Sequence, residues 1–367
     1  MCSSPAAEDG RGLRWRVSQL QERDAPAKDR RVIPLRRPSG PPHTGVLLLN
    51  LGGPDSLDAV EPFLENLFRD PFLIRIPLLK GPARRWFARA VAKRRAPHVR
   101  KLYAEIGGRS PIGPLTEAQA RRLEEELGPG FRCYVAFSAW TPYIRDAVAS
   151  ARADGCARLV GVSLFPQWCS ATTESVFHDL RKAVAGTLPV AEVDRYPDDA
   201  EYLDALASTV REALRRFPDP RRAHVLFSAH GVPVSVIRRG DPYEREIHRT
   251  VSGVLTRLPA GQPWSLSYQS KVGPVKWLEP ATADHLPALA REGVREVLVV
   301  PVAFVSDHIE TLHEQRILLA GIAKEAGIER YEVAKAINDC RLYARALARL
   351  VRQALETRSL SASGATR

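Results

Sequence analysis

The segment VLVVPVAFVSDHIETLHE (Val297 to Glu314) joins an apolar run to a dense block of polar residues. Its first seven residues are apolar throughout, which is typical of a strand buried on both faces of a parallel sheet. Its last nine residues, SDHIETLHE, hold five ionisable side chains. Ligands of such sheets bind at the carboxyl ends of the strands. The junction is therefore a candidate functional site in an α/β fold.

Three acids fall on one face if the polar block continues as an α-helix. Asp307, Glu310 and Glu314 are spaced i, i+3 and i+7. Like charges at helical spacing repel by roughly a few tenths of a kcal/mol per pair. A metal ion, a proton or a basic neighbour could compensate them. A solvated acidic face, with Asp307 as the helix N-cap, is the alternative interpretation.

The chain contains two similar halves. VLLLNLGGP (46–54) aligns with VLFSAHGVP (225–233), and LVGVSLFPQWCSATTE (159–174) aligns with LVVPVAFVSDHIETLH (298–313). Strand-like runs alternate with helical stretches in both halves, which is typical of parallel sheets covered by helices. We therefore expect two similar Rossmann-like, doubly wound domains with a cleft between them.

Five segments follow from this pattern. We expect residues 1–43 to form a disordered basic extension, because they are rich in proline and arginine. Residues 44–172 are expected to form the first domain, and residues 173–335 the second. A C-terminal helix, 336–357, is expected to pack back on the first domain, and 358–367 to form a disordered tail.

The second half holds the ionisable residues that the first half lacks. His230 follows the strand HVLFSA and stands where the first half has Leu51. A histidine that faces carboxylates across a cleft is suited to proton transfer near neutral pH, and a structural histidine is the alternative. Three further replacements are Asp307 for Trp168, His308 for Cys169 and Glu310 for Ala171.

Composition narrows the class of protein. The net charge of +12 is compatible with nucleic acid, an anionic membrane surface or a carboxylate-bearing substrate. No helix-turn-helix, zinc-finger or aromatic RNA-binding motif occurs, so we expect no nucleic-acid partner.

Five scattered cysteines without a CxxC pair favour reduced thiols in the cytoplasm. Ser228 and Ser270 lack the GxSxG motif of a serine hydrolase.

Six ordered motifs resemble the ferrochelatase family, which inserts ferrous iron into a porphyrin to make haem. The resemblance runs from about residue 45 to residue 348 and implies two Rossmann-like domains around a porphyrin cleft. The motifs are LLLNLGGPDS (47–56), YAEIGGRSPI (103–112), FSAHGVP (227–233), RGDPY (239–243), YQSKVGPVKWL (268–278) and SDHIETLHE (306–314).

The resemblance implies roles for individual residues. His230 and Glu310 match the catalytic pair, which accepts porphyrin protons or delivers the metal. Asp307, His308 and Glu314 match a polar ladder that leads away from the pair and carries iron or protons, so these five residues are the expected metal-binding set. The expected porphyrin-binding residues are Leu51, Trp277 and Phe304 along the cleft, and Arg94, Arg95, Tyr103 and Ser110 at its rim.

The resemblance also implies the substrates and partners. The motifs YQSKVGPVKWL and SDHIETL resemble the branch that uses protoporphyrin IX, with Fe²⁺ as the second substrate. The segment PFLIRIPLLKGPARRWF (71–87) is expected to form a lip at the porphyrin entrance that touches an anionic membrane surface from the cytoplasm. A porphyrin-producing oxidase is a candidate partner.

Two departures from the family pattern bear on these expectations. Ser138 stands where the family often has a basic residue, which weakens an iron route through the first domain. The C-terminal tail has no cysteine, so we expect no [2Fe–2S] cluster and no tightly bound cofactor. The alternatives are a chelatase for coproporphyrin III, a chelatase for another tetrapyrrole or metal, and a catalytically silent porphyrin carrier.

Overall fold

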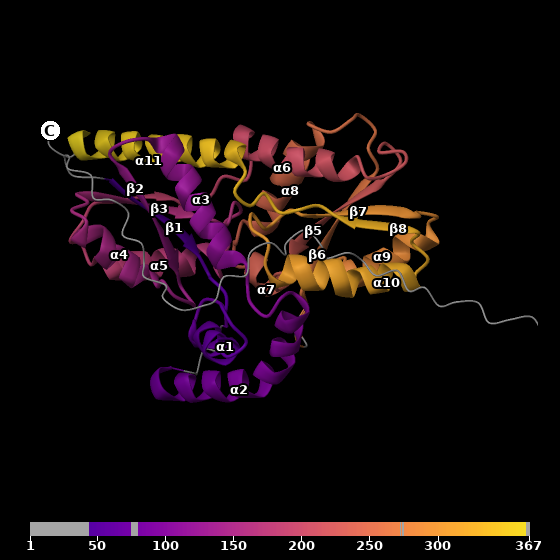
Figure 1. Cartoon of the computed structure of the whole chain (residues 1–367), viewed down its shortest axis with the longest axis horizontal. Coiled ribbons are helices and arrows are strands. Elements are labelled where there is room, and N and C mark those ends of the chain that lie inside the picture. Colours follow the sequence, from indigo (N-terminus) through magenta and orange to yellow (C-terminus); the bar gives the residue numbers. More distant parts are fainter. Residues whose placement is uncertain (1–43, 75–79, 272, 274, 365–367) are drawn as a thin grey trace, which may run out of the picture. The chain divides into compact units, whose positions relative to one another are not determined.

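Two parallel sheets of four strands each organise the chain (Figure 1). The computed structural model describes residues 44–74, 80–271, 273 and 275–364. The expected disordered extension, residues 1–43, lies outside these described residues, as do residues 365–367. The two-domain α/β fold expected from the sequence is confirmed.

The first sheet has the strand order β2-β1-β3-β4. All seven residues of β1 are buried, as its continuous apolar run predicts. Helices α3 and α11 cover one face, and α4 and α5 cover the other. The bounds are β1 Thr44–Asn50, β2 Phe131–Phe137, β3 Arg158–Ser163, β4 Val190–Val193, α3 Ile112–Leu127, α4 Ile144–Ala153, α5 Thr173–Val184 and α11 Arg341–Gly364.

The second sheet repeats this order as β6-β5-β7-β8, which confirms the internal repeat. Helices α6 and α8 pack on one face, and α9 and α10 on the other. The bounds are β5 His224–His230, β6 Trp264–Gln269, β7 Glu296–Pro301, β8 Arg330–Val333, α6 Ala200–Leu214, α7 Val234–Ile237, α8 Tyr243–Leu255, α9 Thr282–Arg291 and α10 Leu319–Glu325.

The predicted domain boundaries need two corrections. The boundary near residue 173 is too early, because β4 pairs in parallel with β3 and so belongs to the first sheet. The last helix, α11, runs from Arg341 to Gly364, so the predicted disordered tail is wrong for residues 358–364. This part of the chain has no proline, and its only glycine is the last helical residue, so nothing ends the helix earlier.

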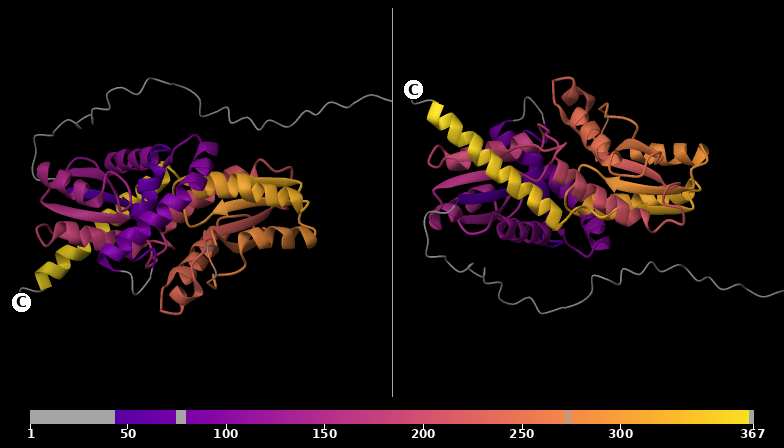
Figure 2. Two further views of the ribbon diagram at one scale, coloured as in Figure 1. Left: turned by 90° about the horizontal axis from the view of Figure 1, so that it is seen from below. Right: turned by 90° about the horizontal axis from the view of Figure 1, so that it is seen from above.

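The chain passes between the two halves twice, and a helix, α6 or α11, follows each passage. After β4 the chain passes to the second half, where α6 packs against α8 and β7. After β8 it returns, and α11 (yellow in Figure 2) lies against α3, β3 and β4. One hydrophobic cluster therefore includes Leu48 of the first sheet, Phe227 of the second sheet and Leu347 of α11. Within it the hydroxyls of Tyr196 and Tyr343 are 2.7 Å apart.

Helices α1 (Val60–Arg69) and α2 (Gly81–Glu105) follow β1 and pack on each other. Ala88, Ala92 and Ala96 of α2 are fully buried at the four-residue spacing of one helix face. The opposite face carries Trp86, which is 75% exposed. Of the predicted lip, residues 71–87, α2 includes residues 81–87, and residues 75–79 lie outside the described residues.

Two histidines share one hydroxyl at the amino end of the second sheet. The Nε2 atoms of His224 and His285 lie 2.8 Å and 2.9 Å from Ser265 Oγ. Burial, followed by the charge of His285, lowers the pKa of His224 to about 4. In an unfolded chain a histidine has a pKa of about 6.5. The unfolded state therefore binds more protons between these two values, and stability is lost as the pH falls through this range.

Replacing His224 by glutamine is expected to weaken this pH dependence, because glutamine can bond to Ser265 without titrating. Between pH 7 and pH 4.5 the unaltered protein should lose about 1–2 kcal/mol more unfolding free energy than His224→Gln. Urea titrations at the two pH values measure the difference. Equal losses in the two proteins would show that His224 does not titrate in this way.

Candidate active site

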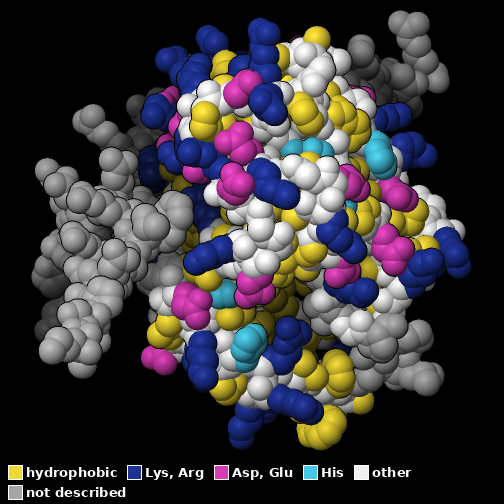
Figure 3. Space-filling model, turned by 90° about the vertical axis from the view of Figure 1, so that its right-hand side faces the viewer, with side chains coloured by type: hydrophobic (Ala, Val, Ile, Leu, Met, Phe, Trp, Pro, Cys, Tyr) yellow, Lys and Arg dark blue, Asp and Glu magenta, His cyan; other side chains and the backbone are white. Residues whose placement is uncertain are grey.

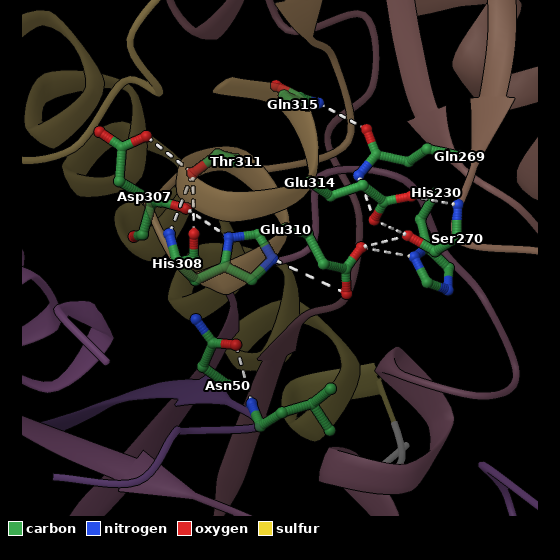
Figure 4. A network of polar contacts seen from close by, with 12 residues as sticks. Asn50, His230, Gln269, Ser270, Asp307, His308, Glu310, Thr311, Glu314 and Gln315 are labelled. Carbon is green, nitrogen blue, oxygen red and sulfur yellow. Dashed lines mark hydrogen bonds and ion pairs between the residues drawn. The ribbon is translucent and has the colours of Figure 1, made fainter. Parts of the chain in front are cut away.

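Polar side chains gather where three strands of the second sheet end (Figure 4). His230 is the last residue of β5, Ser270 directly follows β6, and the segment from Val302 to Ile309 follows β7. These strands are neighbours in a parallel sheet, so their carboxyl ends meet at one edge. The polar residues that the sequence places at strand ends therefore lie together at one edge of the second sheet.

The polar block continues as a π-helix, η1 (Glu310–Leu318), and not as an α-helix. In a π-helix the hydrogen bonds join residues i and i+5, and such turns occur often at functional sites. The wider turn directs Glu310 and Glu314 toward the same residue, Ser270. Asp307 precedes the helix and lies apart from these two acids (Figure 4). The predicted single stripe of three acids is therefore wrong.

Hydrogen bonds of Asp307 hold the start of η1 in place. Its carboxylate accepts hydrogen bonds from Thr311 Oγ1 and Asn338 Nδ2, each 2.9 Å long, and its backbone N–H donates to Asn338 Oδ1. The residue is only 9% exposed, so the alternative of a solvated cap is also wrong. From the first half, Gln119 Nε2 donates to Ser306 Oγ and to the carbonyl of Asn338. The loop before η1 is thereby tied to α3.

His230 and Glu310 form a close pair, with 2.8 Å between Nδ1 and Oε2. Burial lowers the pKa of His230, but the charge and hydrogen bond of Glu310, together with Glu314, outweigh burial and leave it raised. Burial raises the pKa of Glu310, but His230 and His308 outweigh burial and hold it well below its usual value. The His230 side chain is 40% exposed, so solvent reaches this side of the pair.

Ser270 links Glu310 to Glu314. Its hydroxyl oxygen lies 3.0 Å from Glu310 Oε2 and 2.5 Å from Glu314 Oε2, and its backbone N–H donates to Glu314 Oε1 at 2.8 Å. Gln269 Nε2 donates to Glu314 Oε2 at 3.2 Å. In the sequence, Ser270 is a candidate only for a hydrolase nucleophile, which does not predict this role. Its position directly after β6 was the signal that could have found it.

His308 stands beside Phe304, with ring centroids 4.5 Å apart, and the Phe304 ring also lies 6.2 Å from the ring of His230. The Nε2 atom of His308 is 3.9 Å from Glu310 Oε1. Burial lowers the pKa of His308 more than the charge of Glu310 raises it. An imidazole with a lowered pKa and an aromatic ring thus flank the His230–Glu310 pair.

Trp277 lies against the backbone next to His230. A Cβ atom at Gly231 would come within 2.7 Å of the Gln269 carbonyl oxygen and 3.3 Å of the Trp277 ring. Only glycine allows this close approach, which brings β5 and the end of β6 together. In the first half, Leu51 is half-buried after β1, and its N–H donates to the Asn50 side chain.

The predicted rim residues divide into two groups. Arg94 and Arg95 are exposed on α2, and the Arg95 guanidinium lies 5.8 Å from the ring centroid of Phe68. Tyr103 and Ser110 are buried. Ser110 packs so closely on Gly53 that a Cβ there would come within 2.5 Å of its hydroxyl. In this structure only the two arginines present their side chains to solvent.

The equivalent loop of the first half holds the two halves together. The N–H of Trp168 donates to Glu246 Oε2 at 2.7 Å, and the N–H of Ser170 donates to Asp241 Oδ2 at 2.8 Å. Glu246 belongs to α8 of the second half. This loop therefore joins the first half to the second through hydrogen bonds, whereas its counterpart after β7 carries ionisable groups.

The predicted metal-binding residues do not form a ready coordination site. Within residues 44–74, 80–271, 273 and 275–364, no three or more His, Cys, Asp or Glu side chains are grouped to hold a metal ion. His230, Glu310 and Glu314 are instead bonded to one another or to Ser270, and Asp307 is bonded to Thr311 and Asn338.

Comparison with known proteins identifies similar chains. The ferrochelatase family model matches residues 43–355. A ferrochelatase of Geobacter metallireducens is 46% identical over 316 residues, which cover 85% of this chain and 98% of that protein. A ferrochelatase of Synechococcus elongatus is 42% identical over 323 residues, covering 85% and 82% of the two chains. The structure of SirB from Bacillus subtilis with Fe³⁺ has a TM-score of 0.51 at 11% identity, covering 85% and 95%.

Proposed function

The chain belongs to the ferrochelatase family, and on this premise we propose that it inserts Fe²⁺ into protoporphyrin IX, with release of two protons, as the last step of haem synthesis. The observation that carries the proposal is the His230–Glu310 pair at the edge of the second sheet. The imidazole of His230 is partly exposed. The carboxylate of Glu310 is connected to a second acid, Glu314, by hydrogen bonds of Ser270.

Metal insertion requires the loss of two pyrrole N–H protons. When His230 is neutral and donates its Nδ1–H to Glu310, its Nε2 atom carries a lone pair that can take a pyrrole proton. The adjacent carboxylate raises the basicity of the imidazole and stabilises the imidazolium that forms. Glu310 and His308 lie within reach of the same region and offer an anionic and a neutral donor to the incoming Fe²⁺.

We assign the porphyrin to the surface beside this pair. Phe304 and Trp277, with Leu51 from the first half, offer apolar contacts to the macrocycle. Arg94 and Arg95 are exposed on α2 and suit the propionates, because arginine pairs well with carboxylates. Tyr103 and Ser110 are buried, so their proposed role is to support this rim.

Anaerobic incubation of the purified protein with Fe²⁺ or Zn²⁺ tests the function. Protoporphyrin IX and coproporphyrin III are supplied in separate reactions, and porphyrin absorption reports metallation. We expect faster insertion into protoporphyrin IX. Preference for coproporphyrin III would assign the other branch, and porphyrin binding without metallation would identify a carrier.

We propose that no iron–sulfur cluster is present, because such clusters need four ligands that converge. Cys133 and Cys169 are buried in one hydrophobic cluster, Cys156 is buried in another, and Cys340 is half-buried before α11. A visible absorption spectrum of freshly purified protein should be featureless. Charge-transfer bands that accompany labile sulfide would contradict this proposal.

We propose that α2 touches an anionic membrane surface from the cytoplasm, where a porphyrin-producing oxidase would deliver the substrate. At the lower edge of Figure 3, basic side chains stand beside hydrophobic ones. Trp86 is 75% exposed between Arg85 and Arg89, a composition that suits an interfacial helix. Within the described residues, no helix combines the length and the apolarity needed to cross a bilayer.

Replacing Trp86 by alanine is expected to weaken binding to vesicles of mixed phosphatidylserine and phosphatidylcholine about tenfold, because an exposed indole would no longer insert. Sedimentation with vesicles measures the bound fraction. Trp264→Ala is the matched control, since Trp264 is 45% exposed at the start of β6 and should not matter. Equal binding by the three proteins would rule out α2 as the contact.

A further inference from the structure

Two amide side chains hold the loop between β7 and η1. Gln119 of α3, in the first half, is 2% exposed, and its Nε2 donates to Ser306 Oγ and to the Asn338 carbonyl oxygen, each at 3.0 Å. Asn338 lies between β8 and α11. The first half therefore contacts both the loop that carries His308 and the segment that lies against this loop.

Asn338 is bonded to two residues of the loop. Its backbone N–H donates to the Val305 carbonyl oxygen at 2.7 Å. Its side-chain Oδ1 accepts from the Asp307 N–H, and its Nδ2 donates to Asp307 Oδ2, both at 2.9 Å. The residue has a φ of 51°, in the left-handed region that asparagine enters more readily than most residues. The two bonds to Asp307 need one acceptor and one donor, which an amide side chain supplies.

Asp307 connects this anchor to the catalytic residues. Its Oδ1 accepts from Thr311 Oγ1 at 2.9 Å, and Thr311 Oγ1 accepts from the His308 N–H at 3.0 Å (Figure 4). Glu310 stands between His308 and Thr311 in the chain, and its Oε2 is 2.8 Å from His230 Nδ1. Because His230 belongs to β5, a displacement of the loop would change this distance.

We propose that Asn338 and Gln119 are positioning residues for metal insertion, a role that rests on the proposed function. The hydrogen bonds of their side chains go to the loop and its neighbouring segment. Asn338 holds Asp307, and Gln119 holds Asn338 from the first half. Glu310 thereby keeps the position in which it bonds to His230.

Kinetics of Asn338→Gly test the anchor at Asp307. Glycine loses both side-chain bonds but accepts the positive φ without strain, so the backbone bonds to Val305 and Gln119 remain. We expect kcat for the insertion of Zn²⁺ into protoporphyrin IX to fall about ten- to a hundredfold, because a small misplacement of a catalytic group has an effect of this size. The porphyrin KM should change less than about twofold. An unchanged kcat, or a loss that lies in KM alone, would overturn the positioning role.

Gln119→Met tests the contact from the first half. Methionine has a similar length but no hydrogen to donate, so both bonds of Gln119 Nε2 are lost. Gln262→Met is the matched control, because Gln262 is 7% exposed and its Nε2 donates to the carbonyls of Pro220 and Ala223 at the amino end of the second sheet. Urea unfolding should show similar destabilisation of both variants, whereas only Gln119→Met should lose kcat. Equal kcat values in the two variants would overturn the role of Gln119.

Combination with Glu310→Gln separates positioning from a general loss of structure. If Asn338 acts through Glu310, then adding Asn338→Gly to Glu310→Gln should lower kcat by less than about twofold further. Losses that multiply would overturn the positioning role and leave the proposed function intact. Failure of the unaltered chain to metallate any porphyrin would overturn both.

Discussion

Replacing His230 by alanine is expected to lower the rate of metal insertion by about 10²- to 10⁴-fold, the usual contribution of a general base. The variant loses the imidazole that is partly exposed and hydrogen-bonded to Glu310. Porphyrin binding should remain, because the apolar contacts of Phe304, Trp277 and Leu51 do not depend on the imidazole. Stopped-flow absorption measures insertion, and quenching of protein fluorescence measures binding.

His248→Ala is the matched control for this prediction, because His248 is exposed on α8 and takes no part in the site. Its insertion rate should equal that of the unaltered protein. Retained turnover in His230→Ala would remove His230 from the chemical step. Loss of porphyrin binding together with turnover would instead assign His230 to substrate binding.

Replacing Glu310 by glutamine is expected to lower kcat about 100-fold and to shift the pH profile of kcat/KM. His230 must be neutral to accept a proton, so activity rises as the pH increases through its pKa. Glu310 is the main cause that raises the pKa of His230. In Glu310→Gln, only the charge of Glu314 still opposes the lowering of this pKa by burial. The acid limb of the profile should therefore move to lower pH.

The pH profile of kcat/KM between pH 5.5 and 9 measures this shift, because kcat/KM reports groups of the free enzyme. Glu105→Gln is a control of the same chemical kind. Glu105 binds His313 Nε2 at 3.0 Å at the end of α2, outside the catalytic pair. An acid limb in Glu310→Gln that stays at the pH of the unaltered protein would show that His230 is not the titrating base.

The fold and the edge of the sheet that holds the site followed from the sequence, because they depend on strand burial and strand ends. The apolar run of β7 and the aligned motifs around Asn50 and His230 are local patterns that parallel sheets require. The boundary near residue 173 was wrong because β4 has only four residues with alternate burial. Such a short edge strand gives a weak pattern in the sequence.

The detailed site could not be predicted, because tertiary contacts decide it. Thr311 and Gln315 of η1 are buried in its π-helical turn. The hydroxyl of Thr311 donates a hydrogen bond to Asp307, and the side chain of Gln315 donates one to Gln269. An α-helical period imposed on the same residues placed Asp307 beside Glu310. The close packing of Ser270 against both acids depends on its positive φ, which no residue type in that motif indicated.

A single turnover that counts protons tests the central claim most directly. Protein loaded with protoporphyrin IX is mixed with Fe²⁺ under anaerobic conditions in weak buffer, and porphyrin absorption and a pH indicator are followed in the same sample. The account predicts that haem forms and that about two protons per haem reach the solution, with formation slowed strongly in His230→Ala. Haem formation at the same rate in His230→Ala, or no haem at all in the unaltered protein, would contradict it.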